Sequence, residues 1–161
     1  AAFKFDGITT STAELAFGQI SGSAGETSAV IIILGGLYLI ARNMMNWRIP
    51  VAVLTSAFVL SGILYLINSE VYPSPWFMLF SGGLMLGAVF MATDMVSSPI
   101  TPIGLWIYGG IIGILTIVIR VWGGLSEGIM YSILLANAIS PHIDSLIKNR
   151  VYGTKQKIKT A

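Results

Sequence analysis

The sequence predicts an all-α integral membrane protein with about five transmembrane helices. Hydrophobic residues make up 55% of the 161 residues and charged residues only 10%, whereas a soluble domain carries roughly a quarter charged residues. The mean hydropathy is +0.82. A chain of this composition has too few polar side chains for a water-facing surface, so we expect lipid to be its solvent.

Five apolar runs follow a polar first segment, and each is typical of a membrane-crossing helix. They cover about residues 28–41, 49–67, 76–93, 103–119 and 127–147. They are too long for the strands of a membrane barrel, which have about ten residues of alternating polarity. The first run is short, because a full crossing needs roughly 20 residues. The predicted organisation is therefore a polar segment, a helical bundle and a basic tail, at 1–28, 29–147 and 148–161.

The ends of these runs coincide with residues that interrupt an apolar helix. The first run ends at Arg42 and the fourth at Arg120, a side chain expected to reach the outer interface by snorkelling. A polar loop with Pro73 and Pro75 follows the second run. The loop 94–102 after the third run holds two more prolines, which predicts irregular backbone there.

Glycines recur in the third and fourth runs at spacings that let helices approach closely. They are Gly82, Gly83, Gly87, Gly109, Gly110 and Gly113. Small residues are enriched where membrane helices pack, so we expect packing to be their main role. Room for a ligand is the alternative.

The positions of the cations predict an orientation. If the first run enters from outside, seven cations lie in the cytoplasm: Arg42, Arg48, Lys148, Arg150, Lys155, Lys157 and Lys159. Lys4 and Arg120 lie on the other side. Because cytoplasmic loops carry an excess of Lys and Arg, residues 1–28 are predicted outside and the tail inside. We therefore expect a multi-pass protein of a bacterial or archaeal cytoplasmic membrane.

Few side chains here could carry chemistry. The chain has no cysteine and one histidine, His142, which excludes disulfides, iron–sulfur ligation and a multi-histidine metal site. His142 is expected to be structural or interfacial. Asp94, Glu127 and Asp144 lie at span ends. Carboxylates at membrane depth are functional candidates, so Asp94 is a candidate for ion coupling or for a place beside a cofactor, with a solvated loop residue as the alternative.

The first segment contains two runs rich in hydroxyls. In the run from Asp6 to Ala13, Thr12 fits the N-cap of a short helix. In the second, Ser23 and Glu26 have the spacing of a capping box. A polar or anionic ligand at the start of the next helix is the alternative, because free N–H groups point outward there.

These runs together resemble RnfD, the D component of the Rnf electron-transport complex, and its relative NqrB, the B component of the sodium-pumping NADH:quinone oxidoreductase. That family carries a covalent flavin motif, D-x-[IV]-[ST]-G-A-T, followed by G-S-x-G-E-T-S before a membrane helix. Here the two stretches read DGITTST and GSAGETS. Further matches are FMATDMVSSPITP at 90–102, EGIMY at 127–131 and Asn137-Ala138. The resemblance covers essentially the whole chain and corresponds to the C-terminal half of the family.

The resemblance implies that the last threonine of the motif, Thr12, binds FMN through a phosphoester. Asp6, Thr9 and Ser11 would shape the attachment loop. The residues implied to surround the cofactor in the second run are Gly22, Ser23, Gly25, Glu26 and Thr27. Two motif positions differ from the family pattern, since Thr10 and Ser11 replace small residues. The linkage to Thr9, Thr10 or Ser11 therefore stays an alternative.

The implied fold is one repeat of a urea-transporter-like inverted-repeat fold. The implied function is that of a flavin-carrying membrane component of an ion-translocating oxidoreductase complex that moves Na⁺ or H⁺. Its partners would be the lipid bilayer and other subunits, including a second subunit with covalent FMN, and no nucleic acid. A second, non-covalent flavin is left open. The alternatives are a solute channel or transporter without a redox cofactor, and the NqrB component of the quinone-reducing complex.

Overall fold

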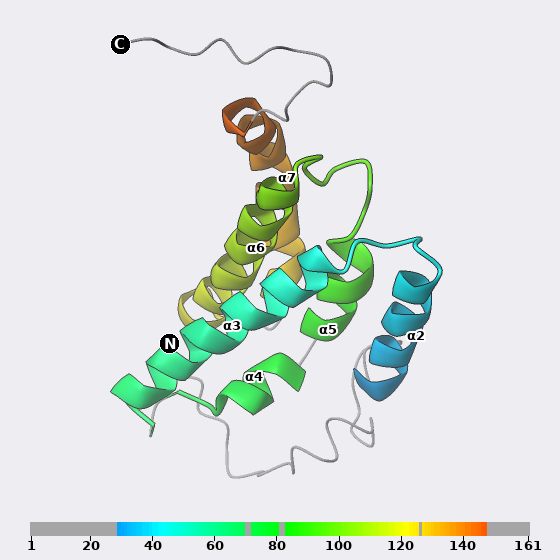
Figure 1. Cartoon of the computed structure of the whole chain (residues 1–161). Helices are drawn as coiled ribbons and strands as arrows, with labels where there is room; N and C mark the ends of the chain where they lie inside the picture. Colours follow the sequence, from blue (N-terminus) through cyan, green and yellow to red (C-terminus); the bar gives the residue numbers. More distant parts are fainter. Residues whose placement is uncertain (1–28, 70–71, 81–82, 126, 148–161) are drawn as a thin grey trace, which may run out of the picture.

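The computed structural model describes residues 29–69, 72–80, 83–125 and 127–147, and these are helical, with no strand among them. The elements in chain order are α2 (Ala29–Ala41), α3 (Arg48–Ile67), α4 (Pro75–Phe80), α5 (Leu84–Leu86), the π-helix η1 (Gly87–Met91), α6 (Pro102–Trp122) and α7 (Gly128–Leu146) (Figure 1). The predicted all-α class is therefore confirmed for the described part of the chain.

Two of the described helices are long and apolar enough to cross a membrane. They are α3, with 20 residues, and α6, with 21. At about 1.5 Å of rise per residue, each spans roughly the 30 Å of a bilayer's hydrocarbon core. The helix α2 has 13 residues, which is short for a crossing. The count of five crossing segments thus stays a prediction.

The helices α3 and α6 run in the same direction and share the most extensive contact of the bundle. Gly109 faces Ile49 and Ala52, and one turn later Gly113 faces Ser56. The helix α7 returns antiparallel along α6 (Figure 1). As a result, α3 and α6 end at the same end of the bundle at which α2 and α7 begin.

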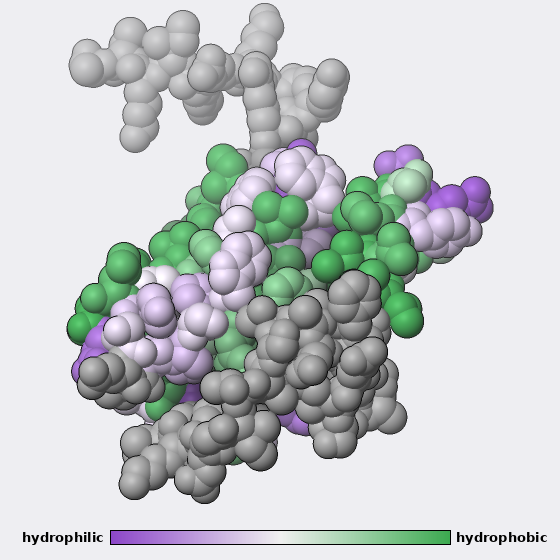
Figure 2. Space-filling view, turned by 90° about the horizontal axis from the view of Figure 1, so that it is seen from below, coloured by the Kyte–Doolittle hydropathy of each residue, from purple (hydrophilic) through white to green (hydrophobic). Residues whose placement is uncertain are grey.

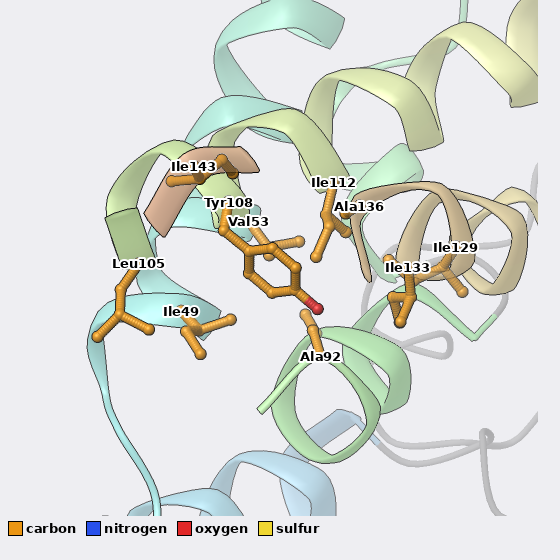
Figure 3. Close-up of a cluster of buried hydrophobic side chains, with 11 residues drawn as sticks. Ile49, Val53, Ala92, Leu105, Tyr108, Ile112, Ile129, Ile133, Ala136 and Ile143 are labelled. Atoms are coloured by element: carbon orange, nitrogen blue, oxygen red, sulfur yellow. The ribbon is translucent and has the colours of Figure 1, made fainter. Parts of the chain in front are cut away.

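The main core lies where α3, α6, α7 and η1 meet. Its buried side chains are Ile49, Val53, Ala88, Ala92, Leu105, Tyr108, Ile112, Ile129, Ile133, Ala136 and Ile143. Figure 3 shows the ring of Tyr108 at the centre of this cluster, with its hydroxyl directed toward Ala92. The core therefore has a phenol at its centre.

The glycines of α6 include two that pack as predicted and one that does not. A Cβ at Gly109 would come within 2.6 Å of the Ala52 side chain, and one at Gly113 within 2.5 Å of the Val53 carbonyl oxygen. A Cβ at Gly110 would meet nothing within 4 Å. Close approach of α3 and α6 therefore requires glycine at 109 and 113, and it does not require glycine at 110.

The apolar run 76–93 does not form one continuous α-helix, which corrects the sequence prediction. Helix α4 ends at Phe80, Gly83 leaves helical geometry with ψ 12°, and the π-helix η1 occupies Gly87–Met91. The N–H of Ala92 donates to the Gly87 carbonyl at 2.7 Å, the i to i−5 bond of a π-turn. Hydropathy does not show whether an apolar run forms one continuous helix. Glycine costs about 1 kcal/mol in a helix interior, which favours a break in this run despite its apolar composition.

The described surface is mainly apolar, as a lipid-facing surface would be. Large side chains such as Ile31, Leu66 and Leu134 are 70% exposed or more. Seen from below, apolar and weakly polar residues dominate the described surface, and strongly hydrophilic ones form small patches (Figure 2). In water such a surface would favour aggregation, whereas lipid is a suitable solvent for it.

Candidate functional site

The residues predicted to bind or surround FMN lie outside the described part of the chain. They are Asp6, Thr9, Ser11, Thr12, Gly22, Ser23, Gly25, Glu26 and Thr27. Their connection to the bundle is nevertheless fixed by the covalent chain, because the segment that carries them leads directly into Ala29, the first residue of α2. Their roles stay predictions.

Asp94 lies after the π-helix, is exposed, and stabilises its own turn. Its Oδ1 accepts a hydrogen bond from the Val96 N–H at 3.3 Å, and its Oδ2 accepts one from the Ser97 hydroxyl at 3.0 Å. This is a local Asx-type arrangement. The irregular backbone predicted for the loop 94–102 is present at residues 94–101, and a role of Asp94 in ion coupling stays a prediction.

Asp144 on α7 holds the same loop from the other side. Both of its carboxylate oxygens accept from the Ile100 N–H, at 3.1 and 3.2 Å. The next residue, Thr101, caps α6 by accepting from the Gly104 N–H, and Pro102 occupies the first turn. The loop between η1 and α6 is therefore fixed at its start by Asp94 and at its end by Asp144 and Thr101.

A polar pair crosses the bundle core between α6 and α7. The Tyr108 hydroxyl, on a side chain that is 1% exposed, donates to Oδ1 of Asn137. Pro141 lies inside α7 and has no N–H, so it cannot donate to the Asn137 carbonyl one turn earlier. The side-chain amide and the backbone carbonyl of Asn137 are therefore two polar groups at one position of an apolar helix. The sequence analysis missed this pair. Asn137, four residues before Pro141 in an apolar run, was the feature that could have indicated it.

Arg120 does not snorkel to the interface as predicted. It is 4% exposed, and its Nη1 donates to the Met78 carbonyl of α4 at 2.8 Å. The last carbonyls of a helix have no partner within that helix, so a guanidinium is a suitable donor to them. The prediction that the Arg120 side chain points to the outer interface was wrong, because the short α4 offers it a buried acceptor near the end of α6.

A cavity of about 450 Å³ lies at the turn between α6 and α7. Its lining residues are Leu125, Glu127, Met130, Tyr131 and Leu134. Glu127 precedes the first residue of α7, yet its side chain makes no capping hydrogen bond to that helix. The cavity combines three flexible apolar side chains with one phenol and one carboxylate.

Within the described ranges, no group of three His, Cys, Asp or Glu side chains is placed to hold a metal ion. Asp94, Asp144 and His142 all lie near one end of the bundle, and Glu127 lies near the other. The chemistry that these residues offer is that of single carboxylates, hydroxyls and amides.

Comparison with known proteins gives consistent matches. The family described as "NQR2, RnfD, RnfE family" matches residues 1–153. The D component of the ion-translocating oxidoreductase complex of Aeromonas hydrophila is 46% identical over 125 residues, 78% of this chain and 36% of the relative. The D component of the proton-translocating ferredoxin:NAD(+) oxidoreductase complex of Clostridium ljungdahlii is 42% identical over 139 residues, 86% of this chain and 42% of the relative. The D component of the Na(+)-translocating ferredoxin:NAD(+) oxidoreductase complex of Acetobacterium woodii is 42% identical over 142 residues, 88% of this chain and 42% of the relative.

The chain thus spans between 36% and 42% of the length of these three relatives. The family match includes the segment with Thr12 and continues through α7 into the tail. The resemblance noted in the sequence is confirmed: this chain belongs to the NQR2, RnfD, RnfE family.

Proposed function

We propose that this chain forms part of a membrane component of an ion-translocating oxidoreductase complex and carries FMN on Thr12. The observation that carries the proposal is the family match over residues 1–153, which includes the segment with the attachment motif. Relatives at 42–46% identity are named as the D components of such complexes. Other subunits of the complex, among them one that also carries covalent FMN, are the proposed partners.

Chemical reasoning supports an organic cofactor. The chain has no cysteine and one histidine, so its own side chains cannot supply the thiolates of an iron–sulfur cluster or two histidine ligands to a haem. A flavin, when bound, supplies one- and two-electron transfer that no amino-acid side chain here supplies. A phosphoester through the Thr12 oxygen would hold it without engaging the ring, so the protein's part is to anchor and orient it.

The cation bias supports an outer location for the attachment segment and an inner location for the tail. The expected result is that an impermeant thiol reagent labels Ser11→Cys in intact cells and leaves Thr154→Cys unlabelled. The opposite labelling pattern would place the attachment segment in the cytoplasm.

The coupled ion does not follow from the comparisons. Two relatives of equal identity, 42%, carry names that specify different ions, a proton and Na⁺. Overall identity therefore does not select the ion, and measuring transport of each ion in sealed vesicles would decide it.

The test of the proposed function is Thr12→Val, co-expressed with the flavin transferase. Valine keeps the shape of threonine and removes the hydroxyl oxygen, so flavin fluorescence of the denatured chain in a gel should be lost while the protein still inserts. Thr10→Val is the matched control and should keep the fluorescence. Fluorescence that persists in the Thr12 variant moves the linkage to a neighbouring hydroxyl, and an unmutated chain that never fluoresces favours the channel alternative.

A further inference from the structure

Two arginines lie at the end of the bundle at which α2 ends and α3 and α6 begin (Figure 1). Arg42 follows α2 and is exposed, and Arg48 is the first residue of α3 and is half-buried. Among the described residues, neither guanidinium has a hydrogen-bond or ion-pair partner. The carboxylates on neighbouring elements, Asp94 and Asp144, accept from groups of the loop between η1 and α6. The two positive charges at this end would therefore attract an anion from outside the chain.

The loop between α2 and α3, which carries the first arginine, has a fixed backbone. Asn43 has a left-handed φ of 54°, and its N–H donates to the Ile40 carbonyl at 2.9 Å. The next N–H, that of Met44, donates to the Leu39 carbonyl at 3.0 Å. These two bonds form the Schellman arrangement that ends a helix. Met45 then packs into the buried cluster between α2 and η1, so the loop is anchored on both sides.

Two indole rings hold the second arginine beside α6. The guanidinium carbon of Arg48 lies 5.5 Å from the centre of the Trp47 ring. The Trp47 ring meets that of Trp106 on α6 edge to face, with 6.1 Å between the ring centres. The two indoles are 48% and 42% exposed. Tryptophan is enriched at the level of lipid headgroups, so this arrangement is typical of a membrane–water interface.

An apolar face of α6 continues from Trp106 toward the middle of the bundle. Ile107, Gly110 and Ile114 follow at spacings of three and four residues, which places them on one side of the helix. Both isoleucines are exposed, and a Cβ at Gly110 would meet nothing within 4 Å. The face thus has open space between two apolar side chains. An acyl chain fits there, whereas a water-soluble anion would leave this face without contact.

We propose that Arg42 and Arg48 bind the phosphate of an anionic phospholipid whose acyl chain lies along α6 past Trp106 and Gly110. A guanidinium donates two parallel hydrogen bonds to phosphate oxygens, which fixes the headgroup as well as attracting it. A headgroup with its own ammonium would place a third cation beside the two arginines, so the site selects a lipid of net negative charge. This inference goes beyond the proposed function and does not depend on the flavin.

The first test measures lipid binding to the whole chain in detergent by native mass spectrometry. The two probes are phosphatidylglycerol and phosphatidylcholine with identical acyl chains. Phosphatidylglycerol should bind about tenfold more tightly, because it brings no cation to face the arginines. Arg42→Gln and Arg48→Gln should each weaken its binding about fivefold, the equivalent of about 1 kcal/mol for one arginine beside an anionic lipid. Lys155→Gln removes the same charge from the tail and is the matched control, which should leave the binding unchanged.

The second test uses the assembled complex in phosphatidylcholine vesicles that contain a small share of phosphatidylglycerol with a photoreactive acyl chain. Cross-links should form on the α6 face from Trp106 to Ile114, where mass spectrometry of peptides locates them. The same photoreactive chain on phosphatidylcholine should label this face several times less. The double variant Arg42→Gln and Arg48→Gln should remove that difference between the two lipids.

Three outcomes would each overturn the lipid site. Equal binding of the two lipids to the unmutated chain would show that the arginines do not select the headgroup. Equal weakening by Lys155→Gln and Arg48→Gln would show attraction to the overall positive charge and not to this position. Absence of cross-links on α6 in the complex would show that another subunit covers the face. Selectivity that depends on both arginines, together with cross-links on this face, supports the proposal.

Discussion

The contact between α3 and α6 makes a quantitative prediction about two glycines on the same helix. A Cβ at Gly113 would clash with the Ser56 Oγ and lie 2.5 Å from the Val53 carbonyl oxygen, two atoms that share a hydrogen bond of 3.0 Å. The carbonyl belongs to the α3 backbone, so Gly113→Ala must separate the helices by about 1 Å to restore ordinary contact. A Cβ at Gly110 meets nothing within 4 Å.

The expected free-energy changes have opposite signs. Overpacking costs about 1–3 kcal/mol and the disturbed Ser56 bond about 1 kcal/mol, against a gain of about 0.5–1 kcal/mol from replacing glycine in a helix. Gly113→Ala should therefore lower the free energy of unfolding by about 1–3 kcal/mol. Gly110→Ala should raise it by about 0.5–1 kcal/mol.

The measurement is reversible unfolding of the purified protein by SDS in mixed micelles, followed by circular dichroism. Gly110→Ala serves as the control for helix propensity, because it changes the same atoms on the same helix without a contact. Equal unfolding curves for the two variants would refute the packing of Gly113 against α3.

Three further variants test single interactions. Tyr108→Phe removes the donor to Asn137 and should lower the free energy of unfolding by about 1 kcal/mol and speed amide exchange in α7; unchanged exchange would show that the bond does not hold α7 in place. Arg120→Gln leaves the Met78 carbonyl without the guanidinium and should lower the free energy of unfolding by about 1–3 kcal/mol, measured in the same micelles; no change would mean that this bond does not stabilise the fold. Asp94→Asn keeps an acceptor for its turn, so stability should hold while ion transport by the assembled complex falls; unchanged transport would leave Asp94 a loop residue.

Helix ends were the part of the fold that the sequence predicted best. The predicted runs 49–67 and 103–119 became α3 at Arg48–Ile67 and α6 at Pro102–Trp122. Prolines and polar loops mark these ends because each interrupts either the hydrogen-bond pattern or the apolar surface of a helix, whereas the charge of Arg120 does not end α6, which continues to Trp122. Such signals are local in sequence, so one chain suffices to recognise them.

Interactions between distant residues could not be predicted in the same way. Tyr108 and Asn137 are 29 positions apart, and Arg120 and Met78 are 42 apart. Which of many polar side chains meet in a bundle depends on helix rotation and direction, which hydropathy does not encode. The division of run 76–93 escaped prediction for a related reason, because its pieces are equally apolar.

The candidate site also has one part that local sequence predicts and one part that only the folded chain shows. The attachment motif is a local pattern, so Thr12 could be named from the sequence, whereas the cavity beside Glu127 brings together side chains from the α6–α7 turn and α7 that only the folded chain assembles. Glu127 was noted in the sequence as a carboxylate at a span end. Its apolar neighbours carried no signal, since leucines and methionines are common throughout the chain.

The buried bond between Arg120 and the Met78 carbonyl has a consequence for biogenesis. The donor is made 42 residues after its acceptor, a delay of about 2–8 s at 5–20 residues per second of synthesis. During that interval α4 has no guanidinium to satisfy its carbonyl, and its six residues are too few to cross a bilayer alone. We therefore expect stable insertion of α4 to follow the synthesis of α6, which supplies the buried donor.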